Sequence, residues 1–348
     1  MSLLASLSGE LEGMRDLDTA ESEAAALALA GDEASFEEKK RFLERLREKG
    51  ETVEEVAAFA QVFRGLARDP ELGEVASRAI DIVGTGGSGS SGYNVSSASA
   101  VVVAAMGVPV LKHGNRAVTS QSGSADFLGL LGLPIQEDAA VLRKSVEVLN
   151  FCFFFAPAFH PAFKEIMPVR KALAEEKTRS IFNILGPLIN PAKPKYQLLG
   201  VFAPEWVPLL ADVLTAVGVK RGLAACCEFE GGVLMDELTS AGQNRVAGIG
   251  SLGGFDAIDL KAVGVSPSEL SVIRGGSPAE NVALFEAMIA GGGRPGLVET
   301  IALNAGAALW IAEAAPDLKE GVAMARDCLQ GGRTAEWVSH ARDFYAEL

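Results

Sequence analysis

The amino-acid sequence predicts an α/β protein, with a small helical N-terminal domain and a larger domain whose mostly parallel central sheet is flanked by helices. Residues 1–75 are dense in Ala, Leu, Glu, Lys and Arg, which mostly favour helices. From position 79 onward, short β-branched runs end in glycine or a polar loop and are followed by helical stretches, an alternation typical of parallel strands. A length of 348 residues allows two or three domains at roughly 100–200 residues each. We therefore expect a helical domain over 1–75 and an α/β domain over 76–348.

Capping boxes locate two helices in the N-terminal region. In a capping box, a Ser or Thr side chain and the side chain of a Glu three residues later each accept a hydrogen bond from the other's backbone N–H group. Such pairs are Ser35 with Glu38 and Thr52 with Glu55. They predict helices that begin near Phe36 and Val53, the first of which ends at Gly50.

Short apolar runs predict the strands of the sheet. They occupy 79–83, 108–111, 151–155, 196–202, 222–228 and 232–235. Helical stretches are expected at 98–106 and 206–217, and the C-terminal third is expected to be at least half helical. Two Ser-Pro pairs predict further helix starts, namely Ser266-Pro267 with Glu269 and Ser277-Pro278 with Glu280.

The charge balance and the cysteines exclude some classes of protein. The chain has 31 Lys and Arg residues against 45 Asp and Glu residues, a net charge of −14 without a Lys/Arg run, so nucleic acids and anionic membranes are not expected partners. We expect no signal peptide, and no apolar run approaches the roughly 20 residues of a membrane helix. Cys226 and Cys227 lie in an apolar run, and the 4 cysteines lack C-x-x-C spacing. We expect reduced, buried thiols in a cytoplasmic protein.

A glycine-rich loop follows the first predicted strand. Five glycines lie between 84 and 92, and the chain then runs through Asn94, Ser96 and Ser97 into the helical stretch. The backbone N–H groups of such a loop and of a helix N-terminus favour a phosphate or pyrophosphate. The pattern matches neither G-x-x-x-x-G-K-[ST] nor G-x-G-x-x-G, which disfavours ATP and NAD. A plain loop is the alternative.

A basic loop follows the second predicted strand, over 112–126. It contains Lys112, His113, Asn115 and Arg116 together with several hydroxyl side chains. Because the carboxyl ends of neighbouring parallel strands lie at one edge of a sheet, Lys112 and Arg116 are expected to neutralise an anion held by the glycine-rich loop. A solvated basic turn is the alternative.

Two later segments suggest an acceptor site and a metal site. The spacing of His160, Phe163 and Arg170 predicts one helical face that presents aromatic surface and a guanidinium to a small acidic aromatic compound. Asp236 and Glu237 directly follow a predicted strand. They are a suitable place for Mg²⁺, which binds one or two protein carboxylates and takes its other ligands from water and substrate phosphates. The two carboxylates could instead begin a turn.

Together and in this order, these segments resemble the anthranilate phosphoribosyltransferase family. The shared motifs are GTGG followed by Asn-x-Ser, KHGNR with SGSAD, the His-Pro segment that runs to Arg170, FN-x-x-GPL-x-NP and the Asp-Glu pair. The resemblance extends over nearly the whole chain. It implies a homodimeric enzyme of tryptophan biosynthesis with a nucleoside-phosphorylase-type fold, in which the amine of anthranilate attacks C1 of phosphoribosyl pyrophosphate and pyrophosphate leaves. It also implies that a piece inserted near 160–180 joins the helical domain.

The resemblance further implies a set of site residues. Phosphoribosyl pyrophosphate, the donor, would contact Gly84, Gly87, Ser88, Asn94, Ser96, Ser97, Lys112, Asn115, Arg116, Thr119, Ser120 and Ser124. Anthranilate would contact Gly84, His113, Asn115, His160, Phe163 and Arg170. Ser96, Asp236 and Glu237 would hold Mg²⁺. Lys112 and His113 would be catalytic, Lys112 by offsetting charge on the leaving pyrophosphate and His113 by taking the amine proton afterwards.

The sequence departs from the family pattern at the donor loop and after Arg170. Ser88 and Gly92 stand where family members usually have Asp and Thr, and ten residues rather than seven separate Arg170 from Ile181. The acceptor is therefore the least constrained part of the assignment. The alternatives are a related phosphoribosyltransferase or nucleoside phosphorylase with a different acceptor, and a catalytically inactive binding relative.

Overall fold

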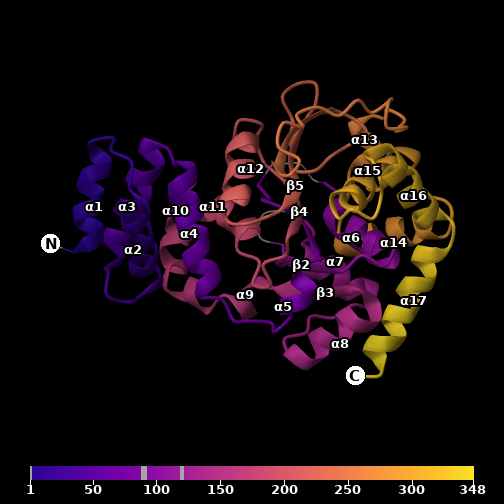
Figure 1. The fold of residues 1–348 in the computed structure, drawn as a ribbon, viewed down its shortest axis with the longest axis horizontal. Coiled ribbons are helices and arrows are strands. Elements are labelled where there is room, and N and C mark those ends of the chain that lie inside the picture. The colour runs from indigo at the N-terminus through magenta and orange to yellow at the C-terminus, as the bar shows by residue number, and fades with distance from the viewer. Residues whose placement is uncertain (1, 88–91, 118–120) are drawn as a thin grey trace.

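The computed structural model describes residues 2–87, 92–117 and 121–348. The N-terminal helices gather at one end of the molecule, the sheet lies in the middle, and the C-terminal helices cover the opposite end (Figure 1). This arrangement confirms the predicted α/β fold class, with a mostly parallel central sheet flanked by helices.

The N-terminal end of the molecule is helical. It contains α1 (Leu3–Glu12), α2 (Thr19–Ala30), α3 (Phe36–Lys49) and α4 (Val53–Gly65). The predicted starts of α3 and α4 are confirmed, and both helices begin with a complete capping box. Gly50 follows α3 with a φ of 90°, a left-handed conformation that glycine adopts without strain. A buried ion pair joins the two helices, with Lys49 Nζ 2.6 Å from Glu55 Oε2.

The central sheet has seven strands in the described part of the chain. They are β1 (Ile80–Gly84), β2 (Val110–Gly114), β3 (Phe151–Phe155), β4 (Tyr196–Gly200), β5 (Arg221–Glu228), β6 (Leu234–Met235) and β7 (Gln243–Gly250). The strand order is β3-β2-β1-β4-β5-β6, and β7 pairs with β5. The pairs among β1 to β5 are all parallel. Each predicted strand overlaps an observed one, so the predicted sheet is confirmed.

The sequence prediction misses β7. This strand runs antiparallel to the whole length of β5, from Gly250 opposite Arg221 to Gln243 opposite Glu228. Its two buried residues, Val246 and Ile249, are three positions apart and belong to the two opposite apolar clusters, and its other residues are partly or fully exposed. With a single buried residue on each side, the strand shows neither the continuous apolar run of a buried parallel strand nor a regular apolar alternation, so no apolar pattern indicates it.

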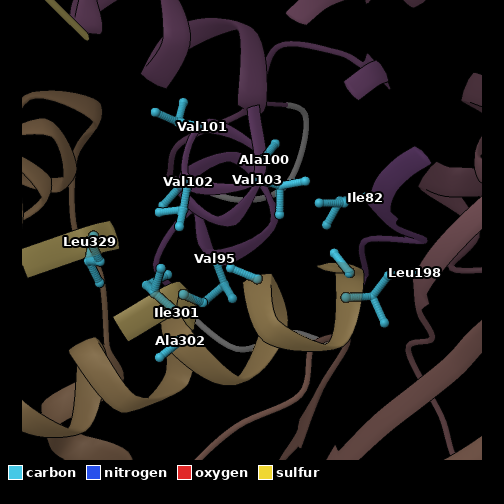
Figure 2. Packing of buried hydrophobic residues seen from close by; sticks show 14 of the residues in the cluster. Ile82, Val95, Ala100, Val101, Val102, Val103, Leu198, Ile301, Ala302 and Leu329 are labelled. Atoms are coloured by element: carbon cyan, nitrogen blue, oxygen red, sulfur yellow. The ribbon is translucent and has the colours of Figure 1, made fainter. Parts of the chain in front are cut away.

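The helix α6 (Val95–Ala105) forms the centre of the larger apolar cluster. Ten of its eleven residues are buried, and they are small or β-branched. Its side chains lie in one cluster with Ile82 and Leu198 of the sheet and with Ile301 and Ala302 of α15 (Pro295–Ile311), as Figure 2 shows. Small side chains let both neighbours approach the α6 backbone closely, which fixes the helix on the sheet.

A second apolar cluster fills the other face of the sheet. Leu199 of β4 and Ala224 of β5 point into it, whereas their neighbours Leu198 and Leu223 face the first cluster. The helix α12 (Trp206–Ala216) and the N-terminal helices complete this second cluster. Because the cluster runs from α1–α4 to the sheet without a break, the division of the chain between 75 and 76 stays a prediction.

Short helices connect the strands. They are α5 (Gly73–Ala76), α7 (Ser124–Leu131), α8 (Ala139–Leu149), α9 (Ala156–Phe159), α10 (Met167–Glu175) and α11 (Phe182–Leu185), with the 3-10 helices η1 (Pro161–Glu165) and η2 (Gly186–Leu188). The helix α10 packs against α3 and lies with the N-terminal helices in Figure 1. Its residues Val169 and Leu173 belong to the second apolar cluster. The segment near 160–180 therefore contacts the N-terminal helices, as the predicted helical domain requires.

The C-terminal region is helical. It contains α13 (Leu270–Ile273), α14 (Pro278–Ile289), α15, α16 (Leu318–Gln330) and α17 (Arg333–Ala346). The predicted helix start at Ser277 is confirmed with a complete capping box. The predicted start at Ser266-Pro267 is wrong, because the Ser266 N–H donates to Glu299 (3.1 Å) and the Ser268 N–H to the Ser240 carbonyl (2.9 Å). These bonds to other elements hold the segment outside a helix, which begins only at Leu270.

The four cysteines are free and buried, as predicted. Burial raises the pKa of Cys226 to about 12 and that of Cys227 to about 11. Both thiols are therefore protonated and unreactive near neutral pH. Within the described ranges, the helices are too short or too polar to cross a membrane.

A close contact between α15 and α16 provides a test of the packing. A Cβ atom on Gly306 would lie 2.5 Å from the Val322 backbone nitrogen. Gly306→Ala is expected to lower the free energy of unfolding by about 1–3 kcal/mol, because the added methyl group pushes α16 away. Urea denaturation followed by circular dichroism measures this loss.

The matched control is Gly9→Ala in α1, where a Cβ atom meets nothing within 4 Å. This substitution is expected to leave the stability unchanged or to raise it by up to about 1 kcal/mol. An equal loss of stability in both variants would contradict the packing argument.

Candidate active site

The loops singled out in the sequence meet at the carboxyl edge of the sheet. β1 has β2 and β4 as parallel neighbours on its two sides. Gly84, Gly114 and Gly200 are the last residues of β1, β2 and β4. The loops after these strands therefore leave the same edge, which is where ligands bind in open α/β sheets.

The glycine-rich loop after β1 leads into the first turn of α6. Gly86 and Gly87 have φ values of 69° and 79°, which favour glycine. Asn94 is the N-cap residue, yet its side chain makes no capping hydrogen bond. Ser97 is fully buried, and its hydroxyl has no hydrogen-bond partner among the described residues. The predicted donor contact at Ser88 lies outside the described residues.

Lys112 is a buried cation at this edge. Its side chain is 1% exposed, and Nζ donates to the carbonyl oxygen of Ile82 and lies 3.3 Å from Ser96 Oγ. Burial lowers the pKa of Lys112, while the carboxylates of Asp81 and Glu237 act in the opposite direction. The ammonium group therefore lies between β1 and the first turn of α6, where an anion in the glycine-rich loop would meet it.

Asp236 occupies a space that two glycines leave open. Gly84 and Gly200 are register partners in β1 and β4. A Cβ atom on Gly84 would lie 2.6 Å from Asp236 Oδ2, and one on Gly200 would overlap the Asp236 backbone oxygen. The Gly86 N–H donates to Asp236 Oδ2 at 2.8 Å. Sequence reasoning missed the role of Gly200, because a glycine at a strand end gives no sign of what approaches it.

Glu237 reaches the first turn of α6 beside Asp236. The Ser96 N–H donates to Glu237 Oε1 at 3.1 Å. Burial and the neighbouring Asp236 charge raise the pKa of Glu237 to about 8, although Lys112 and Ser96 act in the opposite direction. Two carboxylates that repel each other in this way favour a cation between them.

The ligand set distinguishes between metals. In the described part of the chain, no group of three or more His, Cys, Asp or Glu side chains could hold a metal ion. Zinc sites in proteins need three or four such ligands, whereas Mg²⁺ is held by one or two carboxylates and keeps several waters. The Asp236–Glu237 pair with the nearby Ser96 hydroxyl therefore fits Mg²⁺ and does not fit zinc.

The basic loop after β2 is folded around Asp126. The Asp126 carboxylate accepts hydrogen bonds from the N–H groups of Ala117 (2.9 Å) and Gly123 (3.2 Å), and it pairs with the Arg116 guanidinium at 3.1 Å. The structure thus places Asn115 and Arg116 in the loop that continues from β2, and Ser124 at the start of α7, which follows this loop. Thr119 and Ser120 lie outside the described residues.

His113 and His160 form a buried pair. His113 Nδ1 lies 3.2 Å from the carbonyl oxygen of Gly186, which can only accept, so Nδ1 carries the proton. The Nε2 atoms of the two histidines are 3.2 Å apart, so His113 Nε2 accepts and His160 Nε2 donates. His160 Nδ1 is then an acceptor, and it is buried without a hydrogen-bond partner among the described residues.

Burial keeps both histidines neutral near pH 7. It lowers the pKa of His113 to about 3, with a further contribution from His160, and lowers the pKa of His160 to about 4. Both ring nitrogens of His113 are engaged, which disfavours the predicted role of His113 in taking a proton from a substrate amine. The contacts of His113 instead fix the tautomer of His160.

Phe163 and Arg170 lie beside this histidine pair. The ring centroids of His160 and Phe163 are 5.7 Å apart, and Arg170 Cζ is 5.3 Å from the Phe163 centroid and 5.7 Å from that of Phe182. Burial lowers the pKa of Arg170, and no carboxylate in the described residues raises it. A half-buried guanidinium among aromatic rings is suited to an incoming aromatic carboxylate.

The single helical face predicted for these residues is wrong. His160 lies between α9 and η1, Phe163 lies in η1, and Arg170 lies in α10. Pro161 and Pro168 stand at the starts of η1 and α10, where proline favours a new helix over the continuation of the preceding one. The three side chains come together through tertiary packing.

A buried network below the site was not assigned from the sequence. Asp81 in β1 is fully buried, and its carboxylate accepts from Asn190 Nδ2 (2.9 Å) and from the His113 N–H (3.3 Å). Asn190 Nδ2 also donates to the carbonyl oxygen of Leu111 at 2.7 Å. The network ties β1 to the strand that carries Lys112. An acidic residue inside the apolar run 79–83 is the signal that could have found it.

Arg179 also contacts the glycine-rich loop. Its Nη2 donates to the Gly87 carbonyl at 3.2 Å, and its Cζ lies 3.9 Å from the ring centroid of Phe202. No local pattern predicts a contact between residues 92 positions apart, so this residue was missed.

Comparison with known proteins gives relatives for most of the chain. Residues 76–335 match the model described as glycosyl transferase family, a/b domain. The anthranilate phosphoribosyltransferase of Aeromonas hydrophila is 42% identical over 296 residues, which are 84% of this chain and 83% of that relative.

Solved structures agree with this result. The crystal structure of anthranilate phosphoribosyltransferase from Thermus thermophilus is 37% identical, with a TM-score of 0.86 over 97% of this chain and 99% of that one. The Saccharomyces cerevisiae enzyme in complex with PRPP and Mg is 24% identical and shows the same fold, with a TM-score of 0.84 over 99% of this chain and 98% of that one. From the matched model and the identities to these relatives, the chain belongs to the anthranilate phosphoribosyltransferase family of glycosyl transferases.

Proposed function

We propose that this chain transfers the phosphoribosyl group from phosphoribosyl pyrophosphate to anthranilate, giving N-(5-phosphoribosyl)anthranilate and pyrophosphate in tryptophan biosynthesis. The observation that carries the proposal is the meeting of the glycine-rich loop, the first turn of α6, Lys112 and the Asp236–Glu237 pair at one edge of the sheet. These groups supply N–H donors, a cation and carboxylates for a metal, which a diphosphate requires. The relatives' names support the same reaction.

The donor residues are those of the two loops and the first turn of α6. Within the described residues we place phosphoribosyl pyrophosphate against Gly84, Gly87, Asn94, Ser96, Ser97, Lys112, Asn115, Arg116 and Ser124. The loop backbone and the α6 N-terminus favour the pyrophosphate. Arg116 is exposed and paired with Asp126, so it stabilises the basic loop and adds charge at its surface.

Ser96, Asp236 and Glu237 would hold Mg²⁺. When bound, the ion supplies positive charge that offsets the charge of the pyrophosphate. Lys112 is a catalytic residue in this proposal, because its buried ammonium adds a second positive charge beside Ser96, where the leaving group gains negative charge.

The acceptor residues are those beside the histidine pair. Arg170 binds the carboxylate of anthranilate, and Gly84, His113, Asn115, His160 and Phe163 line the path to the donor. The amine nitrogen forms a bond to C1 of the ribose while the bond from C1 to the pyrophosphate oxygen breaks. Because an aromatic amine is neutral near pH 7, attack needs no prior deprotonation, and the amine proton leaves afterwards.

The assembly and location are part of the proposal. Apolar side chains are exposed on the N-terminal helices and their loops, with Leu3 44%, Met14 63%, Leu27 53% and Phe36 41% exposed. We propose that these side chains contribute to the contact with a second copy of the chain. We place the homodimer contact on a helical domain formed by 1–75 with the segment near 160–180. Free, buried thiols are consistent with the cytoplasm.

A direct assay tests the reaction. Anthranilate, phosphoribosyl pyrophosphate and Mg²⁺ are incubated with the protein, and the fluorescence of anthranilate is expected to fall as N-(5-phosphoribosyl)anthranilate forms. Omission of the donor or addition of a chelator is expected to abolish the change. No loss of fluorescence at high protein concentration would contradict the acceptor, and pyrophosphate release with another nitrogenous acceptor would then favour a related transferase.

Substitutions at the proposed donor site are expected to slow turnover. Lys112→Ala and Asp236→Ala are each expected to lower kcat by about 10²-fold or more, since each removes charge stabilisation at the leaving pyrophosphate. Glu230→Gln, an exposed residue of the β5–β6 loop, is the control and is expected to retain activity. Unchanged turnover in either Ala variant would mean that the donor binds elsewhere.

The neutral histidines make stability depend on pH. The pKa of His160 in the folded state is about 4, below the value of roughly 6.5 in the unfolded chain. The unfolded state therefore binds a proton that the folded state does not, and the free energy of unfolding falls as the pH drops from 7 to 5. His160→Gln is expected to reduce this fall by about 2 kcal/mol.

Urea denaturation at the two pH values measures this effect. The exposed His340 provides the control, and His340→Gln is expected to leave the fall as large as in the unmodified protein. The same pH dependence in His160→Gln would contradict the neutral, buried state of the pair.

A further inference from the structure

The side chain of Asn94 is held by groups from two other segments. Its Oδ1 accepts hydrogen bonds from Ser122 Oγ at 2.7 Å and from Asn281 Nδ2 at 2.8 Å. Its Nδ2 donates to the backbone carbonyl of Ser122 at 3.2 Å. Asn94 therefore joins the loop after β1, the loop after β2 and the N-terminal turn of α14, which are distant in the sequence.

Backbone atoms at both ends fix the direction of every bond in this chain of contacts. The Gly276 N–H donates to Asn281 Oδ1 at 2.8 Å, so the other amide atom of Asn281 is the nitrogen, which can only donate. The carbonyl of Ser122 can only accept, so the Asn94 atom facing it is Nδ2. Both ends give the same orientation of the Asn94 amide, which leaves one Nδ2 hydrogen without a partner among the described residues.

Asn281 is itself held rigidly. It is fully buried, and it lies in the capped first turns of α14, where its backbone N–H donates to the carbonyl of Ser277 at 2.9 Å. A Cβ atom on Gly275 would lie 2.7 Å from Asn281 Oδ1 and 2.8 Å from the Gly92 carbonyl oxygen. The segment that precedes α14 thus packs directly on the end of the glycine-rich loop, and Arg274 forms an isolated β-bridge with Gly92.

We propose that Asn281 is a positioning residue for the phosphoribosyl donor: by donating to Asn94 Oδ1 it turns the free Nδ2 hydrogen of Asn94 toward an oxygen atom of the donor. The inference rests on the proposed function, since it takes the donor to be phosphoribosyl pyrophosphate. Because Ser122 donates to the same oxygen, Asn281 also helps to hold the glycine-rich loop and the basic loop in place relative to each other.

Two substitutions of Asn281 separate orientation from simple loss of packing. Asn281→Asp keeps an acceptor for the Gly276 N–H but places a carboxylate oxygen against Asn94 Oδ1. In either orientation the Asn94 amide then places an oxygen against an acceptor: unflipped, Oδ1 faces the carboxylate, and flipped, Oδ1 faces the Ser122 carbonyl and the oxygen atoms of the donor. Asn281→Ala removes the hydrogen bond from Asn281 to Asn94 Oδ1 but leaves both hydrogen bonds between Ser122 and Asn94 in place. The Asp variant is therefore expected to be the more severe of the two for donor binding, although it changes the volume less.

The experiment measures donor affinity directly and in turnover. Calorimetric titration with phosphoribosyl pyrophosphate and Mg²⁺ is expected to show about tenfold weaker binding for Asn281→Asp and a smaller loss for Asn281→Ala. The KM for the donor is expected to follow, while the KM for anthranilate stays within about twofold. A role confined to stability would not produce this split.

Thr334→Val is the matched control. Thr334 is as fully buried as Asn281, and its hydroxyl donates to the Cys328 carbonyl at 2.9 Å in a region outside the proposed site. The Thr334→Val variant is expected to have a lower free energy of unfolding in urea denaturation and an unchanged affinity for phosphoribosyl pyrophosphate.

Three results would overturn the inference. They are unchanged donor affinity in folded Asn281→Asp, a larger loss in Asn281→Ala than in Asn281→Asp, and an equal loss in Thr334→Val. If the unmodified protein binds the donor but does not use anthranilate, the acceptor assignment fails and the calorimetric comparison still decides the role of Asn281. If the unmodified protein does not bind the donor, both proposals are refuted.

Discussion

The burial of α6 between the sheet and α15 is the constraint on which the site depends. With ten of its eleven residues buried, the helix cannot shift without opening gaps on both sides. Its first turn is thereby fixed beside the ends of β1 and β2. There the Ser96 N–H meets Glu237 and the Ser96 hydroxyl lies near Lys112. The apolar packing of α6 thus sets where the polar groups of its first turn lie. The glycine-rich loop connects β1 to this fixed helix start.

The candidate site contains a buried ammonium group within an acidic molecule. A net charge of −14 repels an anionic donor over most of the surface. The buried ammonium of Lys112 is surrounded by the carboxylates of Asp81 and Glu237, and burial raises the pKa of Asp81 to about 6 despite the Lys112 charge. In this low-dielectric setting each charge acts more strongly on its neighbours than it would in water. A divalent cation bound at the Asp236–Glu237 pair would offset the charge of these two carboxylates, which otherwise repel an anionic donor.

The sequence predicts the parts of the fold that local patterns specify. The capping boxes of α3, α4 and α14 mark helix starts, and the apolar run of β3 coincides with the observed strand. It does not predict β7, whose half-exposed residues lack an apolar pattern, nor the break after His160, where tertiary packing replaces a continuous helix. The loop motifs likewise predict where the candidate site lies. The contacts of Gly200, Arg179 and Asn281 could not be predicted, because each depends on a partner distant in the sequence.

These distant contacts have a common physical reason. A glycine-rich loop can approach a phosphate closely, but it has few side chains with which to fix its own conformation, and glycine loses much entropy when ordered. The fixing groups must therefore come from other elements. In the described part of the loop, Asp236 accepts from Gly86, Arg179 donates to Gly87, and the segment before α14 packs on Gly92. With the donor placed in this loop, as proposed above, its binding depends on the positions of residues that do not touch it. A substitution far from the glycine motif is then expected to weaken binding while the motif itself stays intact.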